Sequence, residues 1–388
     1  MNTLSKAKNI KVKVLGIGGA GNNMINSIIQ NNEFNTENIE FWALNTDLQH
    51  LNKDDNFCNN KLLLINSHNN GGGAGGNPLI GKECALNTKD EILKILQDTE
   101  LLVLAAGLGG GTGTGATPVI AEWAKKLGII TIAILTTPFE FEGSGKFNIA
   151  LDGLGEIKKQ TNSFSIVQNQ SMLDNYPDLP YDDALKLANN KLKHLIYSIS
   201  KILYSSWSIN IDFNDLINTI KNGSNLFVAH SRYSGTNRVK NAINNIIKDN
   251  PFKITPNNTY KSVLIFFELD SRGSLKEVND AISMLRNYFG ENVYIKFGII
   301  NNCWNHKNDD FFAISVIAGQ DSFIDESQIT LQNINNSLKN TIKNDDSQTY
   351  ETNSDHQEIG LEMINDKSHK NKESSDEDYS DNIPSFFS

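Results

Sequence analysis

Short apolar runs alternate with amphipathic stretches over the first 160 residues of the chain. Five runs rich in β-branched residues predict strands at 12–16, 39–44, 61–65, 101–105 and 129–135. Between them, apolar residues recur at helical spacing over 22–31, 90–96 and 116–127. Strands that are apolar on both faces and separated by helices predict a parallel, doubly wound α/β sheet.

A long helical pattern follows at 181–204, with apolar residues three and four positions apart. This spacing predicts a helix that turns one face to the core. Beyond Phe213 a second alternation predicts strands at 226–230, 262–269, 292–300 and 311–318, and helices at 237–249 and 274–289. The expected fold is α/β, with an N-terminal Rossmann-like parallel-sheet domain, a long central helix and a smaller C-terminal α/β domain.

After about Phe323 the chain consists mainly of Asn, Ser, Asp, Glu and Lys. Such a segment cannot bury enough apolar surface to offset its ordering entropy, which predicts a disordered acidic tail. The tail ends in the apolar cluster Ile383-Pro-Ser-Phe-Phe387. Two interpretations of this cluster remain open: a terminus without a role, and a short peptide that docks in a partner's groove.

The net charge of the 388-residue chain is concentrated in this tail. Of the total of −10, residues 340–388 contribute −8 through twelve acids and four lysines, which leaves about −2 for all preceding residues. Neutralising nucleic-acid phosphates requires a basic face, and none is present in the sequence. A nucleic-acid partner is therefore not expected.

The cysteines and the start of the chain indicate a cytoplasmic protein. Cys58, Cys84 and Cys303 are odd in number and form no CxxC pair, which favours reduced thiols. The first nine residues lack the apolar core of a signal peptide, and no stretch reaches the ~18 apolar residues of a membrane span. Direct insertion into a membrane is not expected.

Three glycine clusters lie where a strand ends or a helix begins: 16–21, 71–76 and 107–115. The last contains six glycines and two threonines in nine residues. Glycine removes Cβ and permits positive φ, so that consecutive N–H groups can surround an anion at the start of a helix. A strand-to-helix turn needs only one or two glycines, so the cluster at 107–115 predicts phosphate binding.

The kind of phosphate ligand is narrowed by the motifs. Residues 16–21 match GxGxxG, and Asp47 lies downstream, a weak signal shared by nicotinamide and flavin enzymes. A Walker P-loop is excluded, because no GxxxxGK[ST] motif is present. A dinucleotide needs one glycine turn for its pyrophosphate, whereas two glycine loops on neighbouring strand ends indicate a longer polyphosphate.

Residues 109–115, Gly-Gly-Gly-Thr-Gly-Thr-Gly, are the signature of the tubulin/FtsZ family of GTPases. The order of the other segments resembles the FtsZ branch of that family: 16–23, 45–47, 72–78, 136–143, 210–215 and the terminal Ile-Pro-Ser-Phe-Phe. The resemblance covers most of residues 10–320 and the extreme C-terminus. It implies a GTP-binding domain at 1–180, a central helix and acidic loop at 181–213, a C-terminal α/β domain at 214–323, a disordered linker at 324–380 and a partner-binding peptide at 381–388.

The resemblance also implies a GTP/GDP site over the strand ends. The residues that it places near the phosphates are Gly19, Ala20, Gly21, Asn22, Asn23, Gly109, Gly110, Gly111, Thr112, Gly113 and Lys146. Glu142 would bind the ribose, and Asn169 with Asn189 would recognise the guanine edge. Mg²⁺ would accompany the triphosphate, held mainly by phosphates and water, with no protein residue assigned as a metal ligand.

The segment Asn210-Ile-Asp-Phe-Asn-Asp215 carries two carboxylates at positions i and i+3. Acids in the first turn of a helix cap free N–H groups and complement the helix dipole, which is the simplest interpretation. The resemblance implies instead that this loop completes the nucleotide site of a neighbouring subunit. Asp212 and Asp215 would then orient and polarise the attacking water, with Asn210 assisting. A head-to-tail contact of this kind generates filaments.

The function implied is a GTP-hydrolysing protein that forms the cytokinetic ring at the division site of a bacterial cell. Membrane-anchoring division proteins would bind Ile383, Pro384, Phe386 and Phe387. Several positions depart from the family pattern, and three of them are expected near the nucleotide: Lys146 replaces arginine, Leu185 replaces an aromatic residue expected against the base, and Asn22 replaces glycine. Two alternatives remain, a degenerate scaffold with little turnover and an NAD-binding oxidoreductase, and the latter leaves residues 107–115 unexplained.

Overall fold

The computed structural model describes residues 10–31, 35–67, 70–205, 207–222, 225–248, 260–301 and 310–320. These described residues form one compact unit. The predicted linker at 324–380 and the predicted peptide at 381–388 lie outside the described residues. Among the described residues, no helix is long and apolar enough to span a membrane.

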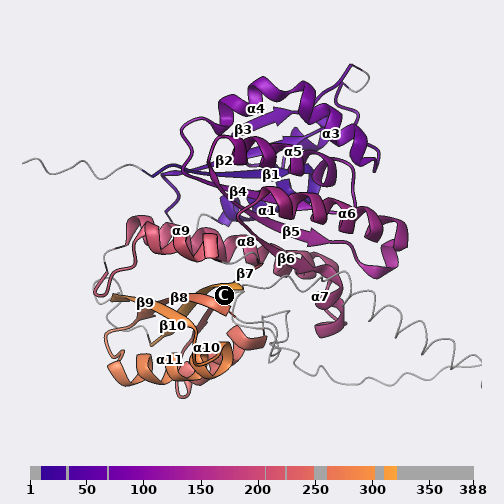
Figure 1. Cartoon of the computed structure of the whole chain (residues 1–388). Coiled ribbons are helices and arrows are strands. Elements are labelled where there is room, and N and C mark those ends of the chain that lie inside the picture. Colours follow the sequence, from indigo (N-terminus) through magenta and orange to yellow (C-terminus); the bar gives the residue numbers. More distant parts are fainter. Residues whose placement is uncertain are drawn as a thin grey trace, which may run out of the picture. The chain divides into compact units, whose positions relative to one another are not determined.

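Ten strands form one sheet, in the order β3-β2-β1-β4-β5-β6-β7-β10-β8-β9 (Figure 1). Their bounds are β1 Val12–Ile17, β2 Ile39–Asn45, β3 Asn60–Leu63, β4 Leu101–Gly107, β5 Ile130–Thr137, β6 Ser163–Gln168, β7 Asn225–Tyr233, β8 Tyr260–Leu269, β9 Tyr294–Asn301 and β10 Phe312–Gln320. The six strands from β3 to β6 are parallel. Their order is that of a Rossmann sheet, as predicted.

The second group of strands continues the same sheet. β7 joins β6 through one parallel pair, Phe164 with Asn225. β10 pairs antiparallel with both β7 and β8, and β9 lies parallel to β8 at the edge. Backbone hydrogen bonds therefore connect the two groups of strands, and the domain boundaries inferred from the sequence stay predictions.

Eleven α-helices and one 3₁₀ turn are described. Their bounds are α1 Gly18–Asn31, α2 Leu48–Leu51, α3 Pro78–Asn87, α4 Lys89–Leu96, α5 Thr112–Lys126, η1 Glu140–Glu142, α6 Ser144–Gln160, α7 Asn169–Asn175, α8 Tyr181–Tyr204, α9 Phe213–Asn222, α10 Arg238–Lys248 and α11 Leu275–Phe289. The predicted central helix coincides with α8, and its buried face includes Leu192, Leu195 and Ile199.

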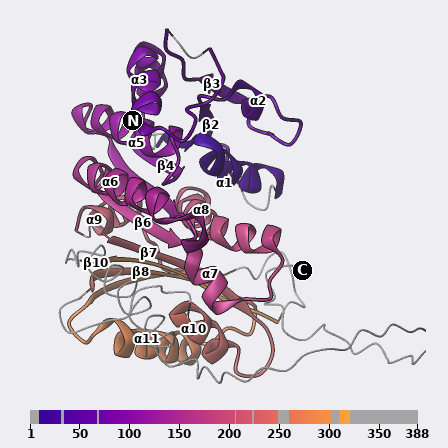
Figure 2. The same ribbon diagram turned by 90° about the vertical axis from the view of Figure 1, so that its right-hand side faces the viewer.

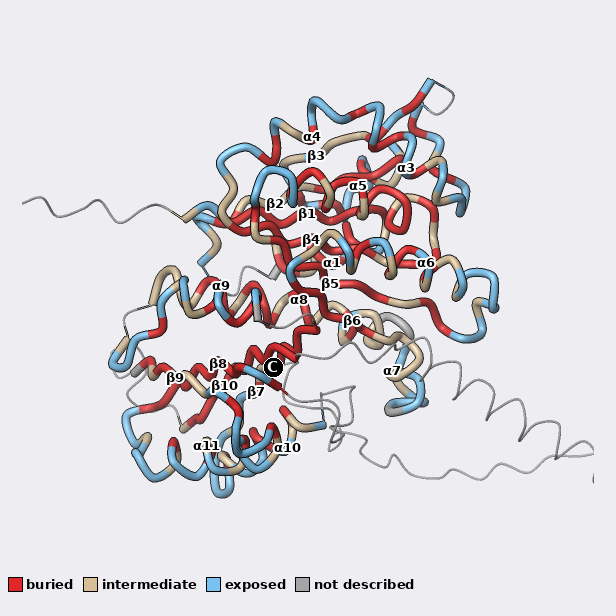
Figure 3. Tube along the Cα trace, in the orientation of Figure 1, coloured by how far each residue is buried: buried red, intermediate tan, exposed pale blue. Residues whose placement is uncertain are grey.

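Three apolar clusters fill the layers between helices and sheet. Side chains of α3 to α6 pack on one face of the N-terminal strands, and side chains of α1, α8 and α9 pack on the other face. Side chains of α10 and α11 cover the C-terminal strands on the side away from α8 and α9 (Figures 1 and 2). The inner strands β1, β4 and β5 are buried along most of their length (Figure 3), which confirms for them the prediction of strands that are apolar on both faces, whereas the edge strands β3 and β9 are largely half-buried or exposed.

Candidate active site

The loop between β4 and α5 exposes a row of unpaired backbone donors. The first hydrogen bond of the helical ladder runs from Gly115 N to the Gly111 carbonyl at 2.9 Å. Within the described residues, no acceptor is present for the N–H groups of residues 110–113. Four adjacent N–H groups at the start of a 15-residue helix are suited to an anion, because the helix dipole adds to their partial charges.

Close packing accounts for most of the glycines at 107–115. A Cβ added to four of them would collide with nearby atoms: Gly107 with Ala20 Cβ at 2.6 Å, Gly111 with Ala74 Cβ at 2.6 Å, Gly113 with the Gly107 carbonyl at 2.3 Å, and Gly115 with the Pro78 carbonyl at 2.0 Å. Gly109 has a φ of +95°, and a Cβ on Gly110 would meet open space. The three clusters thus pack together around one site, and of these glycines only Gly110 would present an added Cβ to open space.

Asn22 joins the ends of β1 and β2. Its buried side chain donates to the Gly16 carbonyl at 2.7 Å and the Leu44 carbonyl at 3.3 Å, and accepts from Asn45 at 3.1 Å. This network explains the departure from glycine at position 22. Of the other predicted residues in this loop, Gly19 is half-buried, Gly21 is buried, and Ala20 and Asn23 are exposed. A Cβ on Gly21 would lie 2.2 Å from the Ala105 carbonyl, so packing requires this glycine as well.

The second glycine cluster is hydrogen-bonded to the end of β2. Gly73 N donates to the Thr46 carbonyl at 3.0 Å, and the Thr46 and Thr112 hydroxyls lie 2.6 Å apart. Asp47 caps α2 by accepting from the N–H groups of Gln49 and His50 at 2.9 and 3.1 Å. In a dinucleotide enzyme the corresponding acid would bind a ribose hydroxyl. The use of Asp47 as a helix cap weakens the oxidoreductase alternative.

Glu142 and Lys146 form an ion pair at the start of α6. The Glu142 carboxylate accepts from Lys146 Nζ at 2.9 Å and from Phe139 N at 2.9 Å. A Cβ on Gly109 would lie 3.0 Å from the Lys146 carbonyl, so this part of α6 borders the loop after β4. The Lys146 backbone therefore lies beside the loop at 108–111, which is called the phosphate loop below, while the binding of a phosphate by the Lys146 ammonium stays a prediction.

Asn169 is the first residue of α7, directly after β6. Its Oδ1 atom is buried and has no hydrogen-bond partner in the described part of the chain. Buried acceptors are nearly always paired, so an orphaned amide oxygen fits a ligand that donates a hydrogen bond, such as a guanine edge. Asn189 and Leu185 are half-buried on α8.

Asp212 and Asp215 cap α9 reciprocally. Asp215 N donates to Asp212 Oδ1 and Asp212 N donates to Asp215 Oδ2, both at 2.9 Å. The capping interpretation is thus confirmed, and it leaves Asp212 and the neighbouring Asn210 exposed. Asp215 also binds Lys296 Nζ of β9 at 2.5 Å. Burial acts to raise the pKa of Asp215, but hydrogen bonds from Lys296 and the Asp212 amide outweigh it and lower that pKa below its ordinary value.

The acid pair and the phosphate loop lie far apart in one subunit. Asp215 is bound to β9, whereas the phosphate loop follows β4. Six strand-to-strand steps separate β4 from β9, or about 29 Å at ~4.8 Å per step. Figure 1 likewise shows α7 and α9 at opposite ends of α8. The acids of one subunit therefore do not reach its own glycine loops.

Two residues near these groups escaped the sequence interpretation. Lys296 is the first, because its partner lies 81 positions earlier in the chain. His50 is the second: its Nε2 atom lies 3.4 Å from the position of a Cβ on Gly19, and its buried Nδ1 atom has no partner among the described residues. No short motif contains either residue, so nothing local in the sequence indicates them.

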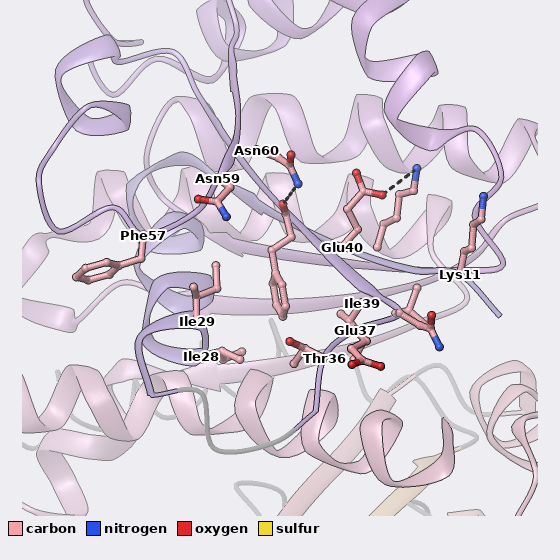
Figure 4. A pocket seen from close by; sticks show the side chains of 14 residues that line it. Lys11, Ile28, Ile29, Thr36, Glu37, Ile39, Glu40, Phe57, Asn59 and Asn60 are labelled. Carbon is pink, nitrogen blue, oxygen red and sulfur yellow. Dashed lines mark hydrogen bonds and ion pairs between the residues drawn. The ribbon is translucent and has the colours of Figure 1, made fainter. Parts of the chain in front are cut away.

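A cavity of about 490 Å³ lies elsewhere, near the amino ends of β1 and β2 (Figure 4). Its lining includes Lys11, Ile28, Glu37 and Phe57. The glycine loops follow the carboxyl ends of the same strands, so this cavity is not the site described above. In open α/β sheets ligands bind at the carboxyl ends.

The comparisons with known proteins agree with this arrangement. The family described as "Tubulin/FtsZ family, GTPase domain" matches residues 11–177. Over 310 residues the chain is 33% identical to "Cell division protein FtsZ" of Mycoplasmopsis pulmonis, a match that covers 79% of this chain and 76% of that protein. The chain belongs to the Tubulin/FtsZ family.

Other members of the Tubulin/FtsZ family match over similar lengths. "Mitochondrial division protein fszB" of Dictyostelium discoideum is 34% identical over 292 residues, covering 74% of this chain and 78% of that protein. The solved structure "FtsZ dimer, empty" of M. jannaschii superimposes with a TM-score of 0.69 at 30% identity, covering 80% of this chain and 88% of that one. Membership confirms the predicted α/β fold class and the resemblance stated from the glycine signature.

Membership of the Tubulin/FtsZ family assigns the chain to a family of GTP-binding cell-division GTPases. Within the described residues, no group of three or more His, Cys, Asp or Glu side chains is placed to hold a metal ion. The roles of the individual site residues stay predictions.

Proposed function

We propose that this chain hydrolyses GTP to GDP and phosphate at a site shared between adjacent subunits of a head-to-tail filament. The observation that carries the proposal is the strand order: the phosphate loop follows β4 and the acid pair is bound to β9, six strand positions away, which corresponds to about 29 Å across the sheet. Two half-sites for one reaction that do not meet inside one copy require a second copy.

The nucleotide-binding half of the site would hold GTP through backbone donors and a few side chains. The N–H groups of residues 110–113 donate to the β- and γ-phosphates, and the loop at 19–23 lies beside them. Glu142 exchanges its bond with Lys146 for the ribose hydroxyls, which frees the Lys146 ammonium for a phosphate. Asn169 Oδ1 accepts from the guanine ring, with Asn189 nearby.

The catalytic half would come from the neighbouring subunit. Asp212 and Asp215, assisted by Asn210, orient a water molecule in line with the γ-phosphorus. The water oxygen forms the new P–O bond as the bond to the β–γ bridging oxygen breaks, one proton of the water passes to solvent through the carboxylates, and the other stays on the phosphate released beside GDP. Mg²⁺ bound to the phosphates and water would neutralise part of the triphosphate charge.

A nucleotide on one face and its acids on the opposite face give a heterologous contact, which repeats into a filament. Loss of the γ-phosphate changes that contact and so limits the lifetime of the polymer. We further propose that these filaments form the cytokinetic ring in the cytoplasm at the division site, bound to membrane-anchoring proteins through Ile383, Pro384, Phe386 and Phe387. The relatives named as cell division proteins and the M. jannaschii dimer support this extension.

A second candidate function is a scaffold that binds GTP with little turnover. Within one subunit, Asp215 is bound to Lys296, and Glu142 is bound to Lys146, so two of the proposed functional acids already have cationic partners. Leu185 also offers no aromatic ring to a base.

GTPase rate per subunit, measured against protein concentration together with sedimentation in GTP and GDP, separates these functions. The shared site predicts a rate per subunit that rises steeply above a threshold concentration, with polymer pelleting in GTP. A rate per subunit independent of concentration would contradict the shared site. Pelleting in GTP with negligible phosphate release would favour the scaffold.

A further inference from the structure

The acidic loop is bound to the edge strand β9 at three points. Ile299 N donates to the Ile209 carbonyl at 3.0 Å, and Ser208 N donates to the Ile299 carbonyl at 2.8 Å. A Cβ on Gly298 would lie 2.7 Å from the Trp207 ring, so the ring packs closely against this glycine. The third point is the ion pair between Lys296 and Asp215. β9 thus supports the loop that carries the acids.

Lys296 determines the environment of Asp215. Only 15% of the Asp215 side chain and 34% of the Lys296 side chain are exposed. Asp215 Oδ2 accepts from both the Lys296 ammonium and the Asp212 amide, at 2.5 and 2.9 Å. Both hydrogen bonds favour the ionised form of the Asp215 carboxylate, and together they fix the orientation of its side chain.

Asp212 differs from its neighbour. It is exposed, and it forms no ion pair among the described residues. Two carboxylates that approach a triphosphate carry a charge of about −2 toward a strongly anionic ligand, and the Lys296 ammonium lowers this to about −1. Asp212 is therefore free to contact water or ligand, while Asp215 is held in place.

We propose that Lys296 is a positioning residue for the GTPase reaction, which holds Asp215 ionised and oriented and offsets the charge of the acid pair. The inference rests on the proposed function of a shared GTPase site. The other titratable groups that face the pair are Asp212 on the same loop and Tyr294 on β9. Hydrogen bonding to Asp215 raises the pKa of Lys296, so the ammonium stays charged through the neutral range.

The variants Lys296→Met and Lys296→Arg test the inference in the full chain. Lys296→Met removes the ammonium while retaining the length of the side chain, and Lys296→Arg restores a cation. Lys276→Met is the matched control, because Lys276 is exposed on α11. Each variant is compared by GTPase rate against pH at a fixed protein concentration above threshold, by fluorescent GDP binding, and by thermal unfolding.

We expect Lys296→Met to lower turnover by about 10- to 100-fold, because a displaced catalytic group loses alignment with the reacting atoms. The acidic limb of its pH profile moves to higher pH, because Asp215 loses the interaction that favours its charged form. Lys296→Arg restores the position of that limb, and GDP binding stays within about twofold of wild type in both variants. An unmoved limb, unchanged or raised turnover, or a loss of GDP binding or thermal stability would each overturn the positioning role.

A carboxylate titration by NMR provides a readout that does not depend on turnover. The pKa of Asp215 in the GDP-bound chain should rise in Lys296→Met and return in Lys296→Arg. An Asp215 pKa that is equal in all three proteins refutes the inference while leaving the shared GTPase site intact. Conversely, wild-type turnover that is independent of concentration refutes the shared site, and the inference about catalysis fails with it.

Discussion

The surroundings of Gly110 and Gly113 predict that substitution by alanine is tolerated at the first position and destabilising at the second. A Cβ on Gly113 would lie 2.3 Å from the Gly107 carbonyl oxygen, well inside the closest approach of real atoms, and this oxygen belongs to the backbone and cannot rotate away as a flexible side chain could. Overpacking of this kind typically costs about 1–3 kcal/mol, and here it also displaces the start of α5. Gly110 has a negative φ and open space at its Cβ position, so Gly110→Ala should change stability by less than about 1 kcal/mol.

The assay is urea unfolding monitored by circular dichroism, combined with titration of a fluorescent GDP analogue. Gly113→Ala should lower the free energy of unfolding and weaken GDP binding at least tenfold, because a shift of about 1 Å misaligns the N–H donors. Gly110→Ala should retain stability and bind GDP within a few-fold. Equal effects of the two substitutions, in either assay, would refute the division of the glycines into packing and ligand-facing positions.

Three further predictions concern Asp212, the ion pairs of Arg238, and the histidines His194 and His230. Asp212→Ala should abolish GTP turnover, retain GTP binding and lower the free energy of unfolding by about 0.5–2 kcal/mol, because the cap of α9 is lost. Asp212→Asn should retain the cap and still lose turnover. Loss of GTP binding in either variant would mean that the acid is only structural. Arg238 binds Asp270, Glu277 and Asp310 at 2.7–2.8 Å, and the Asp270 side chain is fully buried. Arg238→Met should therefore lower the free energy of unfolding in urea by about 3–5 kcal/mol, because it leaves a buried carboxylate without this partner. The control Arg272→Met changes a side chain that is 61% exposed and should lower it by less than about 1 kcal/mol. Burial lowers the pKa of His194 and lowers that of His230 to about 4, so the unfolded chain takes up protons between pH 6.5 and about 4 that the native chain does not. The free energy of unfolding should therefore fall as the pH falls through this window, by up to about 1.4 kcal/mol per pH unit for each histidine, and a slope unchanged in the double variant His194→Asn/His230→Asn would refute this cause.

The elements predicted correctly are those with strong local patterns. α8 was predicted with its observed bounds, because its apolar residues keep helical spacing over 24 positions. β6 was not predicted, since buried serines at 163 and 165 interrupt its apolar residues. α6 was not predicted either, because its three glycines lower helix propensity. One of them, Gly153, lies where a Cβ would be 2.3 Å from the Thr114 side chain on α5. This contact explains why a glycine is needed inside the helix, and it is visible only in the tertiary structure.

In the candidate site, too, the features with a local sequence pattern were predicted and those that depend on distant contacts were not. The glycine clusters and the acid pair are short motifs, so the sequence indicates both of them. The sequence does not indicate that most of the glycines at 107–115 are required by packing, because close contacts such as those of Gly107 with Ala20 and of Gly111 with Ala74 form only in the folded chain. Lys296 was missed for the same reason, since its relation to Asp215 exists only once β9 lies at the edge of the sheet beside the acidic loop.

The central claim, that two subunits complete one GTPase site, is tested most directly by mixing two inactive variants. Gly110→Glu places a negative charge in the open part of the phosphate loop and blocks the nucleotide half, while Asp212→Ala removes the catalytic half. Asp280→Ala, at an exposed acid on α11, serves as the control partner for Gly110→Glu.

The two variants are mixed in equal amounts and assemble at random through a heterologous contact. About a quarter of the interfaces then combine the intact nucleotide half of an Asp212→Ala chain with the intact acids of a Gly110→Glu chain. The account predicts that the mixture recovers up to about a quarter of the wild-type GTPase rate although each variant alone is inactive. A mixture that stays inactive under conditions in which both variants copolymerise with wild type would contradict it.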